Sequence, residues 1–292
     1  MRLKPLSRRA LIGLVLAAPA AAQPSPLRVV ASFSILADLT QRIGEGRVVV
    51  RALAGPDQDL HGFAPRPSDI QAVAQAAVLV TNGLGLEGWA GRIAAAAGFR
   101  GVTVVTTRGV AALKSGHAGS DPHAWQDVAN ARRYVGNIRD GLAIADPANA
   151  AAYADAATRL LAELDALDAE IRALFAPIPR PRRRLVTSHD AFAYFAAAYG
   201  VDMLSIAGTW RDAEPSAREQ AALAAQVKRQ NIRALFVENA SNTAGLRALS
   251  AETGVAIGGK LYADALSAAD GLAGSYIAMM RHNATIIASA LR

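Results

Sequence analysis

Cysteine is absent from this 292-residue chain. Without a thiol, the protein has no disulfide to stabilise it outside the cell and no thiolate to bind a metal or attack a substrate. Its stability must therefore come from burial of a hydrophobic core, which a chain of this length permits. The composition agrees, since 52% of the residues are hydrophobic and 19% are charged, as in a well-packed globular protein.

A second long apolar run is also lacking. The first 22 residues combine four basic residues, an apolar centre at 10–18 and small residues at 20–22, which predicts a secretory signal peptide. Ser7-Arg8-Arg9 fits either general or twin-arginine export. No later segment approaches the roughly 20 apolar residues that span a bilayer. A lipoprotein would need a cysteine at the cleavage site, where this chain has Gln23. We therefore expect a periplasmic protein.

The excess of positive charge is smaller than it first looks. The whole chain carries +7, and removal of the signal peptide takes away four positive charges and no negative ones, which leaves +3. The basic run at 180–184 remains, and such a run is usually a solvated face. The sequence therefore predicts no nucleic-acid partner.

The middle of the chain predicts one long helix. Asp146 and Pro147 are typical of a helix start, and residues 148–175 contain neither glycine nor proline. A single apolar stripe runs along it at spacings of three and four, at Leu160, Leu161, Leu164, Leu167, Ile171 and Leu174. Pro177 ends the helix, which would be about 40 Å long. It separates two halves of similar length and rhythm, so we expect it to link two lobes.

Strands and helices alternate in both halves, which predicts an α/β fold with a parallel sheet in each lobe. The strands are expected at 27–31, 48–53, 77–81, 102–106, 185–188, 201–206, 234–237 and 255–257. The expected organisation is a signal peptide at 1–22, an N-terminal lobe at 23–145, a linking helix at 146–177 and a C-terminal lobe at 178–292.

Histidine is scarce, and three of its five occurrences share one context. His61, His123 and His189 each follow a predicted strand on a loop, where open α/β sheets bind their ligands. Three imidazoles and one carboxylate make a suitable set of ligands for a borderline divalent cation. Asp264, in the equivalent loop of the second half, is the preferred carboxylate. Glu238 is its competitor, or else orients one of the ligands.

The other two histidines are left outside this candidate site. His117 lies in a short loop rich in small residues, and His282 lies within the C-terminal helix. A single histidine in such a setting is most often an ordinary surface residue.

Several motifs occur in an order that is informative as a whole. They are Asp59-Leu60-His61 with Pro65-Arg66-Pro67-Ser68-Asp69, Asp121-Pro122-His123-Ala124-Trp125, His189-Asp190-Ala191-Phe192 with Tyr194, Glu214-Pro215-Ser216, and Leu261-Tyr262-Ala263-Asp264-Ala265-Leu266-Ser267. Together they resemble the zinc/manganese solute-binding proteins of ATP-binding-cassette (ABC) importers, of the cluster A-I type. The resemblance covers essentially the whole mature chain.

The resemblance implies two Rossmann-like α/β lobes joined by one long rigid helix, with one metal ion held between them. Matched motif by motif, the ligands are His61 and His123 from the first lobe and His189 and Asp264 from the second. The implied function is high-affinity capture of a divalent transition metal in the periplasm and its delivery to a permease in the inner membrane. The protein is then expected to be a monomer and not an enzyme.

Zinc is favoured over manganese, because manganese prefers more oxygen ligands than this set provides. Two features depart from the family pattern. Many zinc-dedicated members carry a long loop rich in His, Asp and Glu before the second ligand, where this chain has a short loop with only His117. Members devoted to manganese often have a carboxylate at the position of His189.

Three alternatives stay open at this point. An exported zinc hydrolase would use three histidines and a water, but a fourth protein ligand closes that position, and Glu238 is the only obvious base. A surface adhesin would use the metal only for stability. A binding protein for haem or a siderophore would require an aromatic or arginine-rich cleft, whereas the loops here supply histidines.

Overall fold

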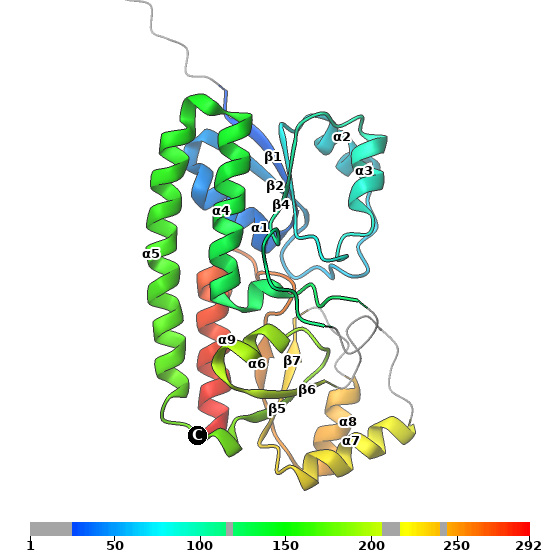
Figure 1. Cartoon of the computed structure of the whole chain (residues 1–292). Coiled ribbons are helices and arrows are strands. Elements are labelled where there is room, and N and C mark those ends of the chain that lie inside the picture. Colours follow the sequence, from blue (N-terminus) through cyan, green and yellow to red (C-terminus); the bar gives the residue numbers. More distant parts are fainter. Residues whose placement is uncertain (1–24, 115–118, 206–216, 240–243) are drawn as a thin grey trace, which may run out of the picture.

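The computed structural model describes residues 25–114, 119–205, 217–239 and 244–292. The expected signal peptide, His117 and the Glu214-Pro215-Ser216 motif lie outside the described residues. Within the described part, the chain forms two four-stranded sheets flanked by helices, and one long helix runs beside both (Figure 1). The expected α/β fold with parallel sheets is confirmed. No helix in these ranges is both long and apolar enough to cross a membrane.

The first sheet has the strand order β2-β1-β3-β4, and all of its pairs are parallel. Its strands are β1 (Leu27–Phe33), β2 (Val48–Ala54), β3 (Val78–Thr81) and β4 (Val102–Val105). Its helices are α1 (Ser34–Gly44), α2 (Pro67–Ala74), α3 (Ala90–Ala96) and α4 (Val128–Ala145). Side chains of α2 and α3 pack on one face, and those of α1 and α4 pack on the other.

The second sheet repeats this order as β6-β5-β7-β8, again with parallel pairs. Its strands are β5 (Arg184–Thr187), β6 (Asp202–Ser205), β7 (Ala234–Glu238) and β8 (Ile257–Leu261). Its helices are α6 (Ala193–Tyr199), α7 (Ala217–Arg229), α8 (Ala244–Thr253) and α9 (Tyr276–Leu291). The helices α7 and α8 cover one face, and α6 and α9 cover the other. The shared strand order is the internal symmetry that the sequence indicated.

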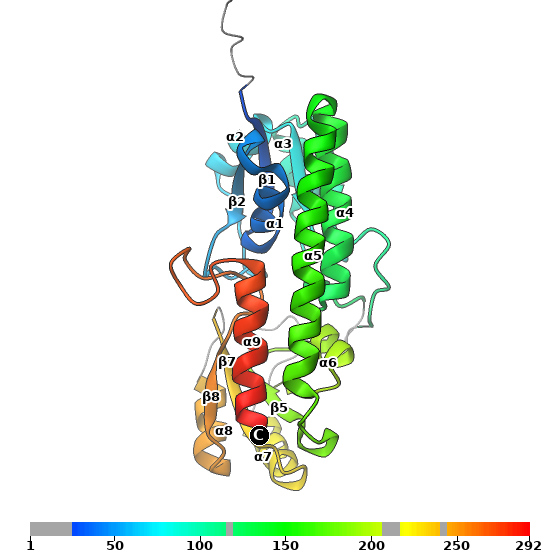
Figure 2. The same cartoon turned by 90° about the vertical axis from the view of Figure 1, so that its left-hand side faces the viewer.

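The long helix α5 (Ala150–Phe175) follows a short 3-10 turn at Pro147–Asn149. It packs against α1 and α4 of the first sheet and against α9 of the second, so that it runs the length of the molecule (Figures 1 and 2). Four stripe residues, Leu160, Leu164, Leu167 and Ile171, are buried, while Leu161 and Leu174 are half-buried. One continuous hydrophobic core therefore includes residues of both sheets, which fixes the sheets relative to each other.

The last strand differs from the sequence expectation. The strand expected at 255–257 is β8, Ile257–Leu261, which includes Gly258 and Gly259. Glycine weakens an isolated strand, and for this reason the pattern placed both glycines in a loop. In the structure, a Cβ on Gly258 would lie 2.9 Å from the ring of Phe236 on β7. Glycine is therefore what allows β8 to pair closely with β7.

Candidate metal centre

The four side chains that the sequence singled out converge between the two sheets. His61 lies on the loop between β2 and α2, His123 on the segment between β4 and α4, His189 just after β5, and Asp264 on the loop after β8. One ligand atom from each residue lies within 4.8 Å of the others. Each comes from the carboxyl end of a parallel strand, where an α/β sheet presents its loops.

The separations suit a small tetrahedral site. Nε2 of His61 lies 3.3 Å from Nε2 of His123 and 3.2 Å from Oδ2 of Asp264. Nε2 of His189 lies 3.3 Å from Oδ2 of Asp264, and Nε2 of His123 lies 3.5 Å from Oδ1. Ligands about 2.0–2.1 Å from a tetrahedral zinc ion would be about 3.3 Å apart. These four side chains therefore fit around one such ion.

A tight turn presents His61. The carboxylate of Asp59 accepts hydrogen bonds from the backbone N–H groups of His61 (2.9 Å) and Gly62 (3.0 Å). A Cβ on Gly62 would lie 2.4 Å from Asp59 Oδ2, so the turn requires glycine there. Leu60 is buried and anchors the turn to the core. A local Asx-type turn thus aims His61 at the cluster.

His123 is fully buried and is oriented by Asp121. Oδ1 of Asp121 lies 2.7 Å from Nδ1 of His123 and also accepts the backbone N–H of His123 at 2.9 Å. The side-chain amide of Asn82, at the end of β3, donates to the carbonyl of Pro122 at 2.9 Å. With Nδ1 as the donor to a carboxylate, Nε2 keeps its lone pair for a cation.

His189 has the same arrangement with Glu238. Oε2 of Glu238 lies 2.5 Å from Nδ1 of His189. The other oxygen, Oε1, accepts from the hydroxyl of Ser188 and from the backbone N–H of His189, both at 2.9 Å. Of the two roles considered for Glu238, its position corresponds to the one that orients a ligand, because it contacts the far nitrogen of the ring.

Asp264 lies on a loop whose backbone is held by side chains. Trp125 and Gln126 both donate to the carbonyl of Ala263, at 2.8 and 2.9 Å. Asn283 of α9 donates to the carbonyl of Tyr262 and accepts its N–H. Because Trp125 and Gln126 follow His123 closely, the segments that carry His123 and Asp264 are bonded directly to each other.

The charges favour a positive species at the centre of the cluster. Burial alone would lower the pKa of His189, but the negative charges of Glu238 and Asp264 outweigh it and hold the pKa well above its ordinary value. Burial would raise the pKa of Asp264, but His189 and His123 outweigh that effect and hold it well below its ordinary value. The centre thus suits a proton on His189 or a metal cation.

Two polar atoms at the centre support the second possibility. Nε2 of His189 and Oδ1 of Asp264 are shielded from solvent and make no well-aligned hydrogen bond within the described ranges. Buried polar atoms normally have a partner, and a cation bound among the four side chains would supply one.

The sequence interpretation missed Asp121 as the partner of His123, although an aspartate two residues before a loop histidine is a recognisable signal for such a contact. His282 lies outside the cluster, with its Nε2 2.9 Å from the carbonyl of Lys260.

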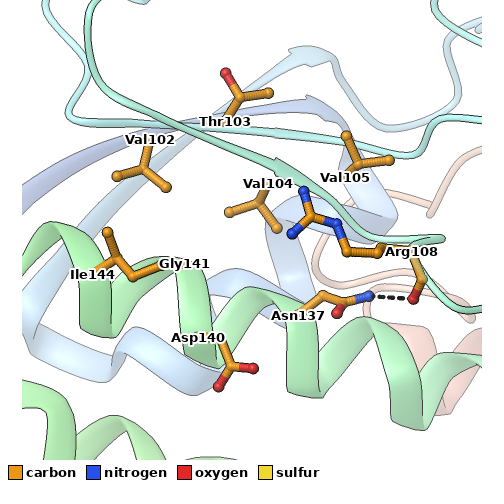
Figure 3. Close-up of a pocket in the computed structure, with 9 residues that line it drawn as sticks. All are labelled: Val102, Thr103, Val104, Val105, Arg108, Asn137, Asp140, Gly141 and Ile144. Atoms are coloured by element: carbon orange, nitrogen blue, oxygen red, sulfur yellow. Dashed lines mark hydrogen bonds between the residues drawn. The ribbon is translucent and has the colours of Figure 1, made fainter.

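A pocket of about 200 Å³ lies elsewhere, between β4 and α4 (Figure 3). Its lining includes Arg108, Asn137 and Asp140 among apolar side chains, and contains no histidine. A lone carboxylate beside an arginine is a poor cation site, so this pocket is not a second candidate metal centre.

Comparison with known proteins identifies the family. Residues 29–290 match the family model of zinc-uptake complex component A, periplasmic (ZnuA). The chain belongs to this family. The resemblance that the motifs indicated is thereby confirmed.

Relatives are similar over nearly their whole length. The manganese-binding lipoprotein MntA of Halalkalibacterium halodurans is 36% identical, with 91% of this chain and 88% of the relative covered. The iron-binding protein YfeA of Yersinia pestis is 33% identical, with 89% and 85% covered. The zinc-binding protein TroA of Treponema pallidum is 31% identical, with 93% and 91% covered. The solved TroA structure superimposes with a TM-score of 0.86, at 30% identity, over 91% of this chain and 99% of TroA.

The printed names of these relatives describe binding proteins, and others are named as substrate-binding lipoproteins of metal ABC transporters. The expectation of a binding protein rather than an enzyme is confirmed. The metals in the names differ from one relative to the next, so family membership leaves the choice of metal open.

Proposed function

We propose that this protein captures a divalent transition-metal cation in the periplasm and delivers it to the permease of an ABC importer in the inner membrane. The observation that carries the proposal is the spacing of 3.2–3.5 Å among His61, His123, His189 and Asp264. Such a buried cluster with orienting carboxylates behind it is the arrangement expected for high-affinity binding.

We propose these four residues as the complete set of protein ligands, and zinc as the preferred cargo. Three imidazole nitrogens and one carboxylate suit zinc, whereas manganese favours a site richer in oxygen. A cluster closed on four sides at tetrahedral spacing also suits zinc, which has no difficulty with four ligands. The relatives named for manganese and iron make manganese the main competitor to test.

The proposed molecule is a monomer exported through a signal peptide at 1–22. Its proposed organisation is an N-terminal lobe at 23–145, a linking helix at 146–177 and a C-terminal lobe at 178–292, with the metal between the lobes. A long, well-packed linking helix favours limited relative motion of the lobes, because movement there would disturb the shared core.

A zinc hydrolase is disfavoured by the same contacts. Catalysis needs an open coordination position and a base within reach of the bound water. Asp264 lies where that open position would be, and Glu238 is occupied by Ser188 and His189.

Native mass spectrometry of protein purified without added metal tests the binding step, followed by competitive titration of zinc against manganese. One metal ion per chain and tighter binding of zinc are the expected results. Tighter binding of manganese would overturn the zinc assignment, and binding of neither would overturn the site.

Metal uptake by intact cells tests delivery. A strain that lacks this gene should take up less zinc at limiting concentration, and a plasmid copy should restore uptake. The His61→Ala copy should fail to restore it although it is exported at the same level. Full restoration by that variant would contradict the proposed role of the site.

A further inference from the structure

Asn239 makes an unusual number of contacts around Asp264. It follows β7 and Glu238, and its backbone N–H donates to the carbonyl of Leu261 at 3.0 Å. Its side-chain Nδ2 donates to the carbonyl of Ala265 at 3.2 Å, and its Oδ1 lies 3.4 Å from the backbone N–H of Ala263. One side-chain amide therefore contacts both residues that flank Asp264.

The same amide reaches the loop that carries His61. Nδ2 of Asn239 also donates to Oδ1 of Asp57 at 3.1 Å. The backbone N–H of Asp57 donates to the carbonyl of Leu266 at 2.8 Å, and Nζ of Lys260 lies 3.6 Å from its carboxylate. Asp57 and Lys260 are exposed, so their ion pair contributes little. The amide and backbone bonds are the stronger connection.

The Asp264 loop needs such support because it lacks regular structure. Residues 262–275 form neither helix nor strand, so side chains must supply the hydrogen bonds that a sheet or helix would provide. Aspartate is short, and a shift of its backbone moves both oxygens relative to His61 and His189. A metal site tolerates displacements of only about 0.5 Å.

We propose that Asn239 is a positioning residue for the metal site. It fixes the Asp264 loop against the histidines and, through Asp57, ties this loop to the one that carries His61. It therefore sets the geometry of the bound metal and the time for which the metal stays bound. The inference rests on the proposed metal-binding function.

Two variants remove these contacts in different ways. Asn239→Asp keeps the shape but replaces the Nδ2 donor by an acceptor, which would face the carbonyl of Ala265 and the carboxylate of Asp57. Asn239→Ala removes the amide without adding charge, and serves if the aspartate variant does not fold. Asp57→Asn removes a charge but keeps a side-chain acceptor and a residue type that tolerates the positive φ of 53°.

Asn137 provides a matched control. Its Nδ2 also donates to two backbone carbonyls, those of Thr106 (2.7 Å) and Arg108 (3.0 Å), beside the pocket between β4 and α4 (Figure 3). Asn137→Ala should lower thermal stability as any lost hydrogen-bonding side chain does, but leave the metal site unchanged.

The experiment measures two properties that general destabilisation would not alter. The first is the visible absorption spectrum of bound Co²⁺, which reports coordination geometry. The second is the rate of zinc transfer to an excess of chelator. For Asn239→Ala and Asn239→Asp we expect a changed Co²⁺ spectrum and zinc release about tenfold faster or more, the lower end of the effect of losing a group that supports a ligand. Asp57→Asn and Asn137→Ala should resemble the wild type in both measurements.

The outcomes separate this inference from the function on which it rests. A wild-type spectrum and release rate in Asn239→Ala would overturn the positioning role and leave the metal-binding function intact. Equal changes in Asn137→Ala would also overturn it, since the effect would then be general. If the wild-type protein itself bound neither Co²⁺ nor zinc, the proposed function and this inference would both be wrong.

Discussion

Oε2 of Glu238 lies 2.5 Å from Nδ1 of His189, and this contact turns Nε2 of the same ring toward Asp264, 3.3 Å away. Asp121 has the same relationship to His123, at 2.7 Å. One histidine from each half of the chain is thus held by a carboxylate on its far nitrogen. Such a carboxylate fixes the ring and makes the facing nitrogen a stronger ligand.

Removal of a ligand should weaken metal binding and leave the fold intact. His61→Ala truncates a side chain on a surface loop, so the melting temperature of the metal-free protein should stay near that of the wild type. Zinc at 100 times the dissociation constant should stabilise the wild type by about 2.7 kcal/mol, and most of that gain should be absent in the variant. His282→Ala, outside the cluster, is the control for thermal melts with and without zinc. A wild-type zinc shift in His61→Ala would remove this residue from the ligand set.

Exchange of the third histidine should change the metal preference. His189→Glu replaces a nitrogen by oxygen and should lower the ratio of zinc to manganese affinity. The new carboxylate would face Glu238, so the variant should be combined with Glu238→Gln to relieve the repulsion. Glu238→Gln alone is the control. Competition titration measures the ratio, and an unchanged value in the double variant would mean that ligand softness at position 189 does not set selectivity.

Acid should release the metal, and the loss should begin above pH 6.5. The pKa of His189 is held well above its ordinary value of about 6.5 by Glu238 and Asp264, which outweigh burial. A raised pKa means that the metal-free site binds its proton more tightly, so affinity falls as the pH falls through that raised value. Glu238→Gln removes one of the charges responsible, so the fall should begin at a lower pH in this variant.

Apparent zinc affinity between pH 5 and 9 measures this effect, with proton uptake read by calorimetry in buffers of different ionisation enthalpy. Up to three protons should be taken up per ion released, one for each imidazole. A flat profile between pH 5 and 7 is expected only for a site built mainly from carboxylates, whose ordinary pKa values lie near 4. Such a profile would contradict the three-histidine assignment.

The linking helix should contribute to stability through its buried stripe. Leu164 is fully buried on α5, so Leu164→Ala should lower the free energy of unfolding by about 2–5 kcal/mol. Leu161, on the same helix, is half-buried, and Leu161→Ala should cost clearly less. Urea unfolding of the metal-free protein compares the two. Equal costs would mean that the stripe does not carry the packing between α5 and the two sheets.

Local patterns were sufficient for much of the fold. Period-two and β-branched segments predicted strands because one strand presents successive side chains to opposite faces, and the stripe from Leu160 to Ile171 predicted α5 because a helix repeats every 3.6 residues. The glycine-rich start of β8 could not be assigned in this way. Its strand character comes from pairing with β7 and from the close approach of Gly258 to Phe236, both of which are distant in sequence.

The candidate site divides along the same line. The sequence determined which residues lie at strand ends, because in a parallel sheet each strand delivers its following loop to the same edge. It thereby selected His61, His123 and His189. Only the tertiary structure decided that these residues meet Asp264, since that depends on how α5 and α9 pack the two sheets together. It also decided that Glu238 and Asn239 lie behind the ligands, because a hydrogen bond between side chains far apart in sequence has no local signal.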